Sequence, residues 1–287
     1  MEDLTNRGRL LISCPDQPGI VASVARVLFE QGANIVHSDQ HSTDPSGGLF
    51  FMRVEFELPG LADTLPALER SFDAVAERFA MTWRITRAGI PKRLALFVTR
   101  EDHCLQEILW QQRAGDLDAR IVMVVSNRTV LEPIARAWGI PFHHIPVTPD
   151  TKLEAERRQM ALIDGQVDVV VLARYMQILS EEFVARWRNR IINIHHSFLP
   201  AFAGANPYRQ AYERGVKLIG ATAHYVTTDL DAGPIIEQDV VRVDHRHSVE
   251  DLRRVGRYIE RMVLARALRW HVEDRILVHG NKTVVFP

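Results

Sequence analysis

The hydrophobic and polar positions of residues 1–86 predict a small unit of strands and helices. Short apolar or alternating runs predict strands, and helical spacing of Val24, Val27 and Leu28 is typical of an amphipathic helix. Clusters of Pro, Gly and Asp separate these segments. The expected elements are a strand at 9–14, a helix from 20 to the Gln31-Gly32 stop, strands at 34–43 and 49–57, a helix at 61–79 and a strand at 81–86. This βαββαβ order predicts a ferredoxin-like sandwich.

A different pattern, strands alternating with helices, follows an expected linker at 87–92 and fills an expected second domain at 93–287. The predicted strands are 93–98, 120–125, 142–145, 167–172 and 191–194, with helices starting near 102, 129, 150 and 181. A helix at 207–214, strands at 218–225 and 235–242, and a long helix from Ser248 complete the pattern. The fold class is therefore α/β, with a doubly wound, mostly parallel sheet as the second domain.

Composition narrows the range of functions. Apolar residues make up 46% of the chain and charged residues 25%, which is typical of a globular protein. Lys and Arg number 35 against 36 Asp and Glu, a net charge of −1 that gives no basic footprint for nucleic acid. Two cysteines, Cys14 and Cys104, are too few for a small secreted protein held together by several disulfides. Residues 1–6 are polar and acidic and do not resemble a signal peptide. We therefore expect a cytoplasmic protein.

One uncharged stretch, Ile191–Tyr208, is long enough to suggest a membrane span. It contains Pro200 and Pro207 together with polar residues such as Asn193 and His195. In a membrane-spanning helix, two prolines would leave backbone polar groups without hydrogen-bond partners unless neighbouring segments supplied them. We interpret the stretch as the wall of a pocket and expect no membrane partner.

Three polar groups lie near predicted strand ends, where open α/β sheets bind ligands. Asn193 and His195 share one face of their strand, because side chains alternate, and could bind an oxyanion together. His224 ends a later strand, and Asp231 lies in the turn Leu230–Pro234. Taken alone, each of these residues could instead be a hydrogen-bonded structural residue or a turn residue without a catalytic role.

Other catalytic chemistries find weaker support. No GxSxG is present, and Cys104 at a helix start is either a thiol of lowered pKa or a small semi-buried residue. The loop 99–103 after the first strand of the second domain is acidic and lacks GxGxxG, which disfavours a pyrophosphate. The pairs His143-His144 and His245/His247 lack the spacing of an HExxH site, so we expect no metal.

Several motifs together resemble the folate-dependent formyltransferase fold, a variant of the Rossmann type. They are Asn193–His195 followed by Ser197–Pro200, His224 seven residues before Asp231, and the stretch 171–180, which is similar to a folate-pocket strand and loop. The first domain, with Pro15–Ile20, is similar to an ACT domain. The combination resembles the formyltetrahydrofolate deformylase family over nearly the whole chain. The chain departs from the pattern at Asn206, where a basic residue is more usual.

The resemblance implies hydrolysis of 10-formyltetrahydrofolate to formate and tetrahydrofolate, supplying formate to purine biosynthesis and balancing one-carbon pools. Asn193 and His195 would donate to the tetrahedral oxyanion. Asp231 would orient His195 and transfer the proton of the attacking water to N10. No metal or cofactor is implied. The implied folate-binding residues are Met176, Gln177, Leu179, Val184, Val226 and Thr228.

For the first domain the resemblance implies an amino-acid effector, glycine or methionine, near Asp16, Gly19 and Ile20. Gly19 permits close backbone approach, and the helix that follows favours a carboxylate. Edge pairing of such domains implies a homo-oligomer. Two alternatives remain at this point: a formyltransferase that passes the formyl group to an amine, and a folate- or amino-acid-sensing protein without turnover.

Overall fold

The computed structural model describes residues 4–44, 47–201 and 206–287 and divides the chain into two compact units. The first unit holds the chain up to Pro91 with 273–277 and 284–287, and the second holds 92–272 with 278–283. The boundary at 91 lies inside the expected linker 87–92. The two C-terminal segments of the first unit were expected in the second domain instead, because no element was predicted after the last long helix.

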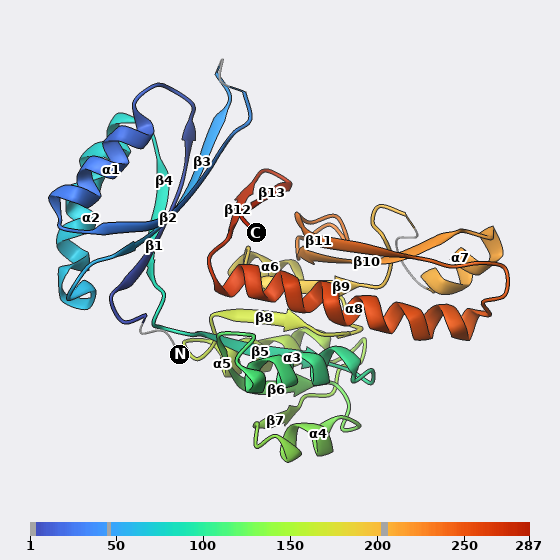
Figure 1. The fold of residues 1–287 in the computed structure, drawn as a ribbon. Coiled ribbons are helices and arrows are strands. Elements are labelled where there is room, and N and C mark those ends of the chain that lie inside the picture. Colours follow the sequence, from blue (N-terminus) through green and yellow to red (C-terminus); the bar gives the residue numbers. More distant parts are fainter. Residues whose placement is uncertain (1–3, 45–46, 202–205) are drawn as a thin grey trace. The chain divides into compact units, whose positions relative to one another are not determined.

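The first unit contains one antiparallel sheet of strand order β2-β3-β1-β4, with helices α1 and α2 over one face (Figure 1). Its elements are β1 (Arg7–Pro15), α1 (Ile20–Glu30), β2 (Asn34–Ser42), β3 (Leu49–Glu57), α2 (Leu61–Arg78) and β4 (Thr82–Arg87). Leu10 and Ile12 of β1 join the core beneath the helices. This arrangement is the predicted βαββαβ sandwich.

The other face of the same sheet is covered by the end of the chain. Leu11 and Phe51 form a second cluster with Leu277 and Phe286. Arg53, only 1% exposed, donates from Nε to the Asp274 carbonyl and from Nη2 to the Glu273 carbonyl, each over 2.9 Å. Both faces of β1 are therefore buried, which explains its continuous apolar run.

The second unit contains a seven-stranded sheet of order β11-β10-β9-β8-β5-β6-β7. Neighbours from β9 to β7 are parallel, whereas β10 is antiparallel to β9 and β11. The strands are β5 (Lys92–Val98), β6 (Ala119–Ser126), β7 (Phe142–His144), β8 (Val169–Leu172), β9 (Ile191–His195), β10 (Leu218–Tyr225) and β11 (Ile235–Arg242). The helices are α3 (His103–Ala114), α4 (Glu132–Ala137), α5 (Lys152–Ile163), α6 (Glu181–Arg186), α7 (Pro207–Arg214) and α8 (Val249–Val272).

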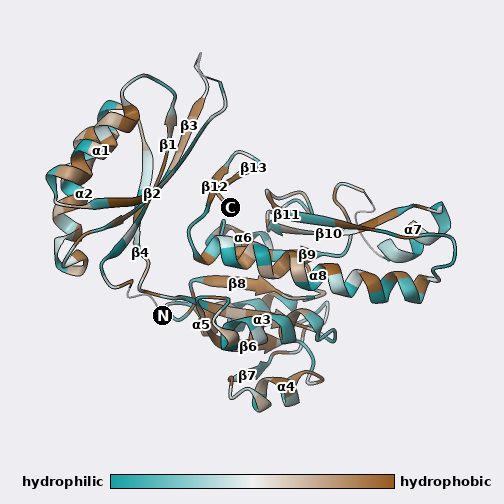
Figure 2. Cartoon of the chain, viewed as in Figure 1, coloured by the Kyte–Doolittle hydropathy of each residue, from teal (hydrophilic) through white to brown (hydrophobic). Residues whose placement is uncertain are grey.

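The chain runs from β5 outward to β7 and then returns to β8 on the other side of β5, so the sheet is doubly wound with a switch point between β5 and β8. Strand β8 is apolar along its length, as a central parallel strand should be (Figure 2). The expected fold class is confirmed. Helix α4 begins at Glu132 rather than near Thr129, with a proline in its first turn, where no backbone donor is lost.

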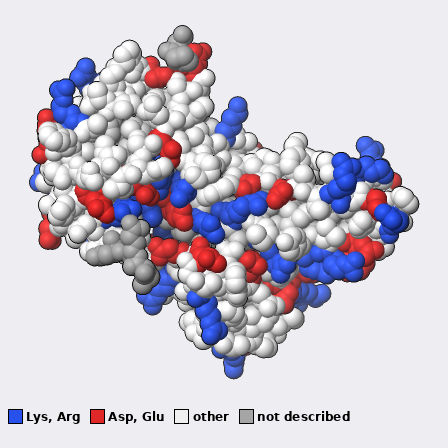
Figure 3. Space-filling view, in the orientation of Figure 1, with Lys and Arg blue, Asp and Glu red and all other residues white. Residues whose placement is uncertain are grey.

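Two short strands, β12 (Ile276–His279) and β13 (Lys282–Val285), form a hairpin that the sequence analysis did not predict. Among the described residues, no helix combines the length and apolar character needed to cross a membrane. On the face drawn in Figure 3, charges of both signs are interspersed, in keeping with the near-neutral balance of 35 basic and 36 acidic residues.

Candidate active site

Strand β9 presents Asn193 and His195 on one face, as predicted from the alternation of a strand. The antiparallel register places His224 of β10 directly opposite Asn193. Asn193 Nδ2 lies 3.2 Å from His224 Nε2, and His224 Nδ1 lies 2.9 Å from the Tyr225 carbonyl. Because that carbonyl can only accept, His224 carries its proton on Nδ1 and accepts from Asn193 at Nε2. His224 therefore orients the Asn193 amide and leaves its second N–H for a ligand.

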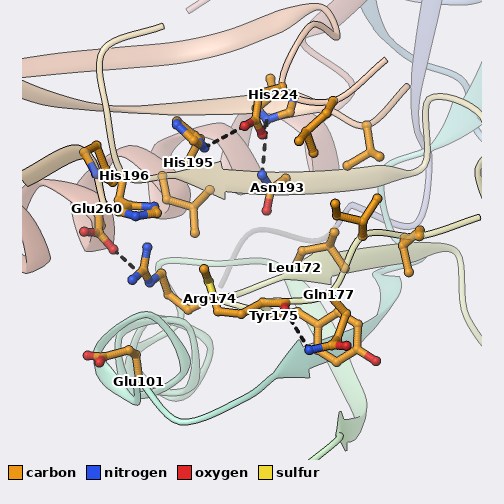
Figure 4. Close-up of a pocket in the computed structure, with 18 of the residues that line it drawn as sticks. Glu101, Leu172, Arg174, Tyr175, Gln177, Asn193, His195, His196, His224 and Glu260 are labelled. Atoms are coloured by element: carbon orange, nitrogen blue, oxygen red, sulfur yellow. Dashed lines mark hydrogen bonds and ion pairs between the residues drawn. The ribbon is translucent and has the colours of Figure 1, made fainter. Parts of the chain in front are cut away.

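The turn between β10 and β11 brings Asp231 to this pair. Asp231 Oδ2 lies 3.3 Å from His195 Nδ1, and Oδ1 lies 3.8 Å from His224 Nε2. Asp231 adopts a left-handed backbone with φ of 55°, which carries its side chain toward β9. The structure thus brings together all three predicted catalytic residues and adds His224, for which no role was predicted. Figure 4 shows Asn193, His195 and His224 of this group.

Burial and the neighbouring histidines set the charges of this group. Burial raises the pKa of Asp231, but the hydrogen bond and charge of His195 outweigh it and hold the pKa below its usual value. Burial lowers the pKa of His224, so this ring is neutral at physiological pH. The site therefore pairs an ionised carboxylate with His195, next to a neutral His224.

His195 Nε2 is buried and has no hydrogen-bond partner among the described residues. The ring belongs to the wall of a pocket of about 560 Å³. A buried polar atom without a partner is rare in native proteins and is commonly satisfied by a ligand or water. The orientation of His195 therefore indicates where a substrate oxygen binds.

The pocket lies outside the carboxyl ends of β5, β8 and β9, next to the switch point. Of the predicted folate-binding residues, it is lined by Met176, Gln177, Leu179, Val226 and Thr228. Val184 is buried in α6 and is not among the residues that line this pocket, so its contact with a folate stays a prediction.

The loop that follows β8 is held at both ends by hydrogen bonds. Met176 N–H donates to Thr99 Oγ1 over 3.1 Å, and Ser180 N–H donates to the buried Glu156 carboxylate over 3.1 Å. Met176 and Ile178 nevertheless keep more than half of their surface exposed. A fixed backbone carrying exposed apolar side chains suits a flat, hydrogen-bonding ring.

A buried network that the sequence analysis did not predict lines the same pocket around Glu260 of α8, which is 1% exposed. Its carboxylate accepts from Tyr208 Oη over 2.6 Å and from His103 Nε2 over 2.8 Å, and Arg174 Nε lies 3.5 Å away. Burial would raise the pKa of Glu260, but His103 and Arg174 lower it to about 2. Gly256 makes room for Tyr208, since a Cβ there would lie 1.9 Å from the hydroxyl.

The stretch expected to form a pocket wall, 191–208, contributes two segments to the pocket lining. Asn193–His196 and Asn206–Tyr208 line the pocket, whereas 202–205 lie outside the described residues. Burial and Arg174 lower the pKa of His196 to about 3, so this ring is neutral. Asn206 starts α7 in a left-handed conformation with φ of 56°.

Cys104 is fully buried, and burial raises the pKa of its thiol well above the usual value. The alternative of an activated thiol at this helix start is therefore wrong, because the thiol does not reach solvent. Among the described residues, His103, Cys104 and Glu260 form a group close enough to share a metal ion. There Glu260 accepts a hydrogen bond from His103 Nε2 over 2.8 Å, and the cationic Arg174 lies 3.5 Å from the same carboxylate.

The predicted effector residues surround the start of α1 in the first unit. Gly19 caps the helix with φ of 94°, and Asp16 accepts a hydrogen bond from Ser42 Oγ. Ile20 is 2% exposed and packs in the core, so only its backbone is available to a ligand. The turn from Asp16 to Ile20 is thus held by the hydrogen bond from Ser42 and by the packing of Ile20 in the core.

The two units match different family models: one described as Formyl transferase over residues 92–268 and one described as ACT domain over residues 8–73. A formyltetrahydrofolate deformylase of Bacillus subtilis is 57% identical over 98% of this chain and 94% of its own. The crystal structure of a formyltetrahydrofolate deformylase from Pseudomonas syringae has a TM-score of 0.94 at 50% identity, covering 98% of this chain and 94% of that one. Glycinamide ribonucleotide transformylase 1 of Symbiobacterium toebii reaches a TM-score of 0.65 at 33% identity, covering 69% of this chain and 95% of its own.

Proposed function

Because this chain belongs to the formyltetrahydrofolate deformylase family, we propose that Asn193, His195 and Asp231 hydrolyse the formyl amide of 10-formyltetrahydrofolate in its second unit. The resemblance seen in the sequence and the expected enzyme class, an amide hydrolase that releases formate and tetrahydrofolate, are confirmed. The observation that carries the site assignment is Asp231 Oδ2, 3.3 Å from His195 Nδ1, with His195 Nε2 buried and open to a ligand in the pocket wall.

The oxyanion is assigned to Asn193 and His195. Attack of water on the formyl carbon places a negative charge on the former carbonyl oxygen. Asn193 offers the amide N–H that His224 does not use, and we assign the second donor to His195 Nε2, with Asp231 Oδ2 holding the ring 3.3 Å from Nδ1. Loss of one such donor typically lowers turnover by roughly 10²–10³.

Proton transfer is assigned to Asp231. Its lowered pKa keeps the carboxylate ionised at neutral pH, ready to accept a proton from the attacking water at Oδ1. The same proton then goes to N10 as the carbon–nitrogen bond breaks. This leaves tetrahydrofolate and formic acid, and the acid releases the second proton of the water to solvent as it becomes formate. A positioned acid–base group contributes roughly 10²–10⁴ in rate.

The pterin ring is assigned to the loop after β8. The Gln177 N–H already donates to the Tyr175 carbonyl over 2.9 Å, so the Gln177 carbonyl and the Leu179 backbone are the groups proposed to bind the ring. Val226 supplies an apolar wall and Thr228 a polar edge, both in the pocket lining. No metal or cofactor enters this mechanism.

Water rather than an amine is the proposed acceptor. The segment after β5, from Thr99 to the first turn of α3 at Cys104, has no glycine for close backbone approach to a phosphate, and its Glu101 lines the pocket. We expect millimolar glycinamide ribonucleotide to leave formate release unchanged and to yield no formylated product by mass spectrometry. Formylglycinamide ribonucleotide appearing as fast as formate would overturn the proposal.

The first unit is proposed to bind glycine or methionine at the turn of Asp16 and Gly19, where the N-terminus of α1 favours a carboxylate. Titration calorimetry is expected to show binding of one of the two amino acids, accompanied by a change in formate release. Gly19→Ala should weaken that binding, because φ of 94° strains any side chain. Neither heat nor a change of activity with either amino acid would refute this effector assignment.

A homo-oligomer in the cytoplasm completes the proposal. Strand β2 is an edge of the first unit's sheet, and most of its residues are exposed, so its backbone can pair with a second copy. Light scattering that gives the mass of a monomer would contradict the oligomer. The compartment is inferred from Cys14 and Cys104, both free and buried.

A further inference from the structure

The position of the Asp231 carboxylate depends on the turn between β10 and β11. Asp231 has a left-handed backbone and lies outside both strands, so no hydrogen bonds of the sheet hold its backbone in place. One side of the turn is held by the sheet: Tyr225 N–H donates to the Pro234 carbonyl over 2.9 Å. Gly233 allows this approach, since a Cβ there would lie 1.8 Å from the Tyr225 carbonyl oxygen. These contacts fix the end of the turn that leads into β11.

The hairpin of β12 and β13 also holds the turn, through hydrogen bonds to the carbonyls of Ala232 and Ile235. Asn281, at the tip after Gly280, donates from Nδ2 to the Ala232 carbonyl over 2.8 Å. Thr283 Oγ1 donates to the Ile235 carbonyl over 2.6 Å. Ala232 is the residue next to Asp231, so the Asn281 bond fixes a peptide group that begins one residue after the catalytic carboxylate.

We propose that Asn281 and Thr283 are positioning residues for Asp231: the hairpin tip sets the place of the carboxylate through the carbonyls of Ala232 and Ile235. The inference rests on the proposed catalytic role of Asp231. Neither side chain lines the pocket, so each acts on the reaction only through the turn. Small displacements of a catalytic group, on the order of 1 Å, are known to cost roughly 10²-fold in rate.

The stem of the same hairpin belongs to the first unit, and its tip belongs to the second. In the first unit, Leu277 and Phe286 pack with Leu11 and Phe51 of the sheet. Along the chain, Asn281 and Thr283 therefore lie between Leu277 and Phe286, two residues that belong to the first unit.

Asn281→Ala and Thr283→Val test the proposal. Each removes one neutral hydrogen bond from the turn, and we expect kcat to fall roughly 10-fold with the folate Kd unchanged. Thr283→Ser keeps the donor and should restore kcat. Lys282→Ala, on the same hairpin, is the matched control and should behave like the unmodified protein.

A double-mutant cycle separates positioning from a general structural role. If Asn281 acts through Asp231, Asn281→Ala should cost almost nothing further in an Asp231→Asn background. An equal loss in both backgrounds, or full activity of both single variants, would overturn the positioning role. Full activity of Asp231→Asn alone would instead refute the catalytic assignment, so the two failures are distinguishable.

Discussion

Replacing Asp231 with asparagine is expected to lower turnover by at least about 10²-fold while leaving folate binding largely intact. Asparagine keeps the shape of the side chain but cannot accept the proton of the attacking water, and it removes the negative charge 3.3 Å from His195 Nδ1. Steady-state formate release and equilibrium folate titration measure the two effects separately.

Two further variants complete this experiment. Asp244→Asn, an exposed aspartate beyond β11, should leave turnover unchanged. His195→Ala added to Asp231→Asn should cost little more, because residues that act as one unit are not additive. Near-normal turnover of Asp231→Asn would sink the catalytic assignment.

The Glu260→Ala substitution is expected to have the largest effect on stability. It leaves the Arg174 charge and the Tyr208 hydroxyl buried without their acceptor, and breaking a buried ion pair typically costs about 3–5 kcal/mol. For a unit of this size that loss should lower Tm by on the order of 10 °C in a thermal unfolding experiment. Glu250→Ala, on the exposed start of the same helix, is the matched control, and a surface pair such as Glu250–Arg253 contributes at most about 1 kcal/mol. A Tm for Glu260→Ala equal to that of the control would contradict the role of the network.

The same network is expected to make the stability of the protein depend on pH in the acid range. The pKa of Glu260 is about 2 in the folded protein, below the ordinary value of 4.5 that applies when the chain is unfolded. The ionised carboxylate therefore stabilises the protein fully above pH 4.5, and this contribution is lost as the pH falls from 4.5 toward 2. In the Glu260→Gln variant, the free energy of unfolding should therefore fall less between pH 4.5 and pH 2 than in the unmodified protein.

The fold was predictable wherever local pattern and packing agree. The run Val169–Leu172 gave a central strand, and the alternation of Asn193 and His195 put both side chains on one face. The hairpin at 276–285 was missed, although Ile276–His279 and Lys282–Val285 flank a Gly-Asn pair, which is a hairpin signal. Its strands are short, and Leu277 and Val284 pack with Leu11 and Phe51, which lie near the other end of the sequence.

The three residues proposed as catalytic, Asn193, His195 and Asp231, could be found from the sequence because they lie in motifs at strand ends. The network around Glu260 was not, because α3, α7, α8 and the loop after β8 each contribute one residue to it. No spacing within the sequence brings His103, Tyr208 and Glu260 together. Only the winding of the sheet does so.

The central claim is that the site around Asp231 transfers the formyl group to water. The most direct test is turnover of 10-formyltetrahydrofolate without any acceptor, in water enriched in heavy oxygen, with mass spectrometry of the formate. The account predicts one heavy oxygen atom per formate, tetrahydrofolate in equal amount, and a loss of this product of at least about 10²-fold in Asp231→Asn. Tetrahydrofolate that forms only when an amine is added, together with the formylated amine in place of formate, would contradict it, as would no formate at all from a folate-bound enzyme.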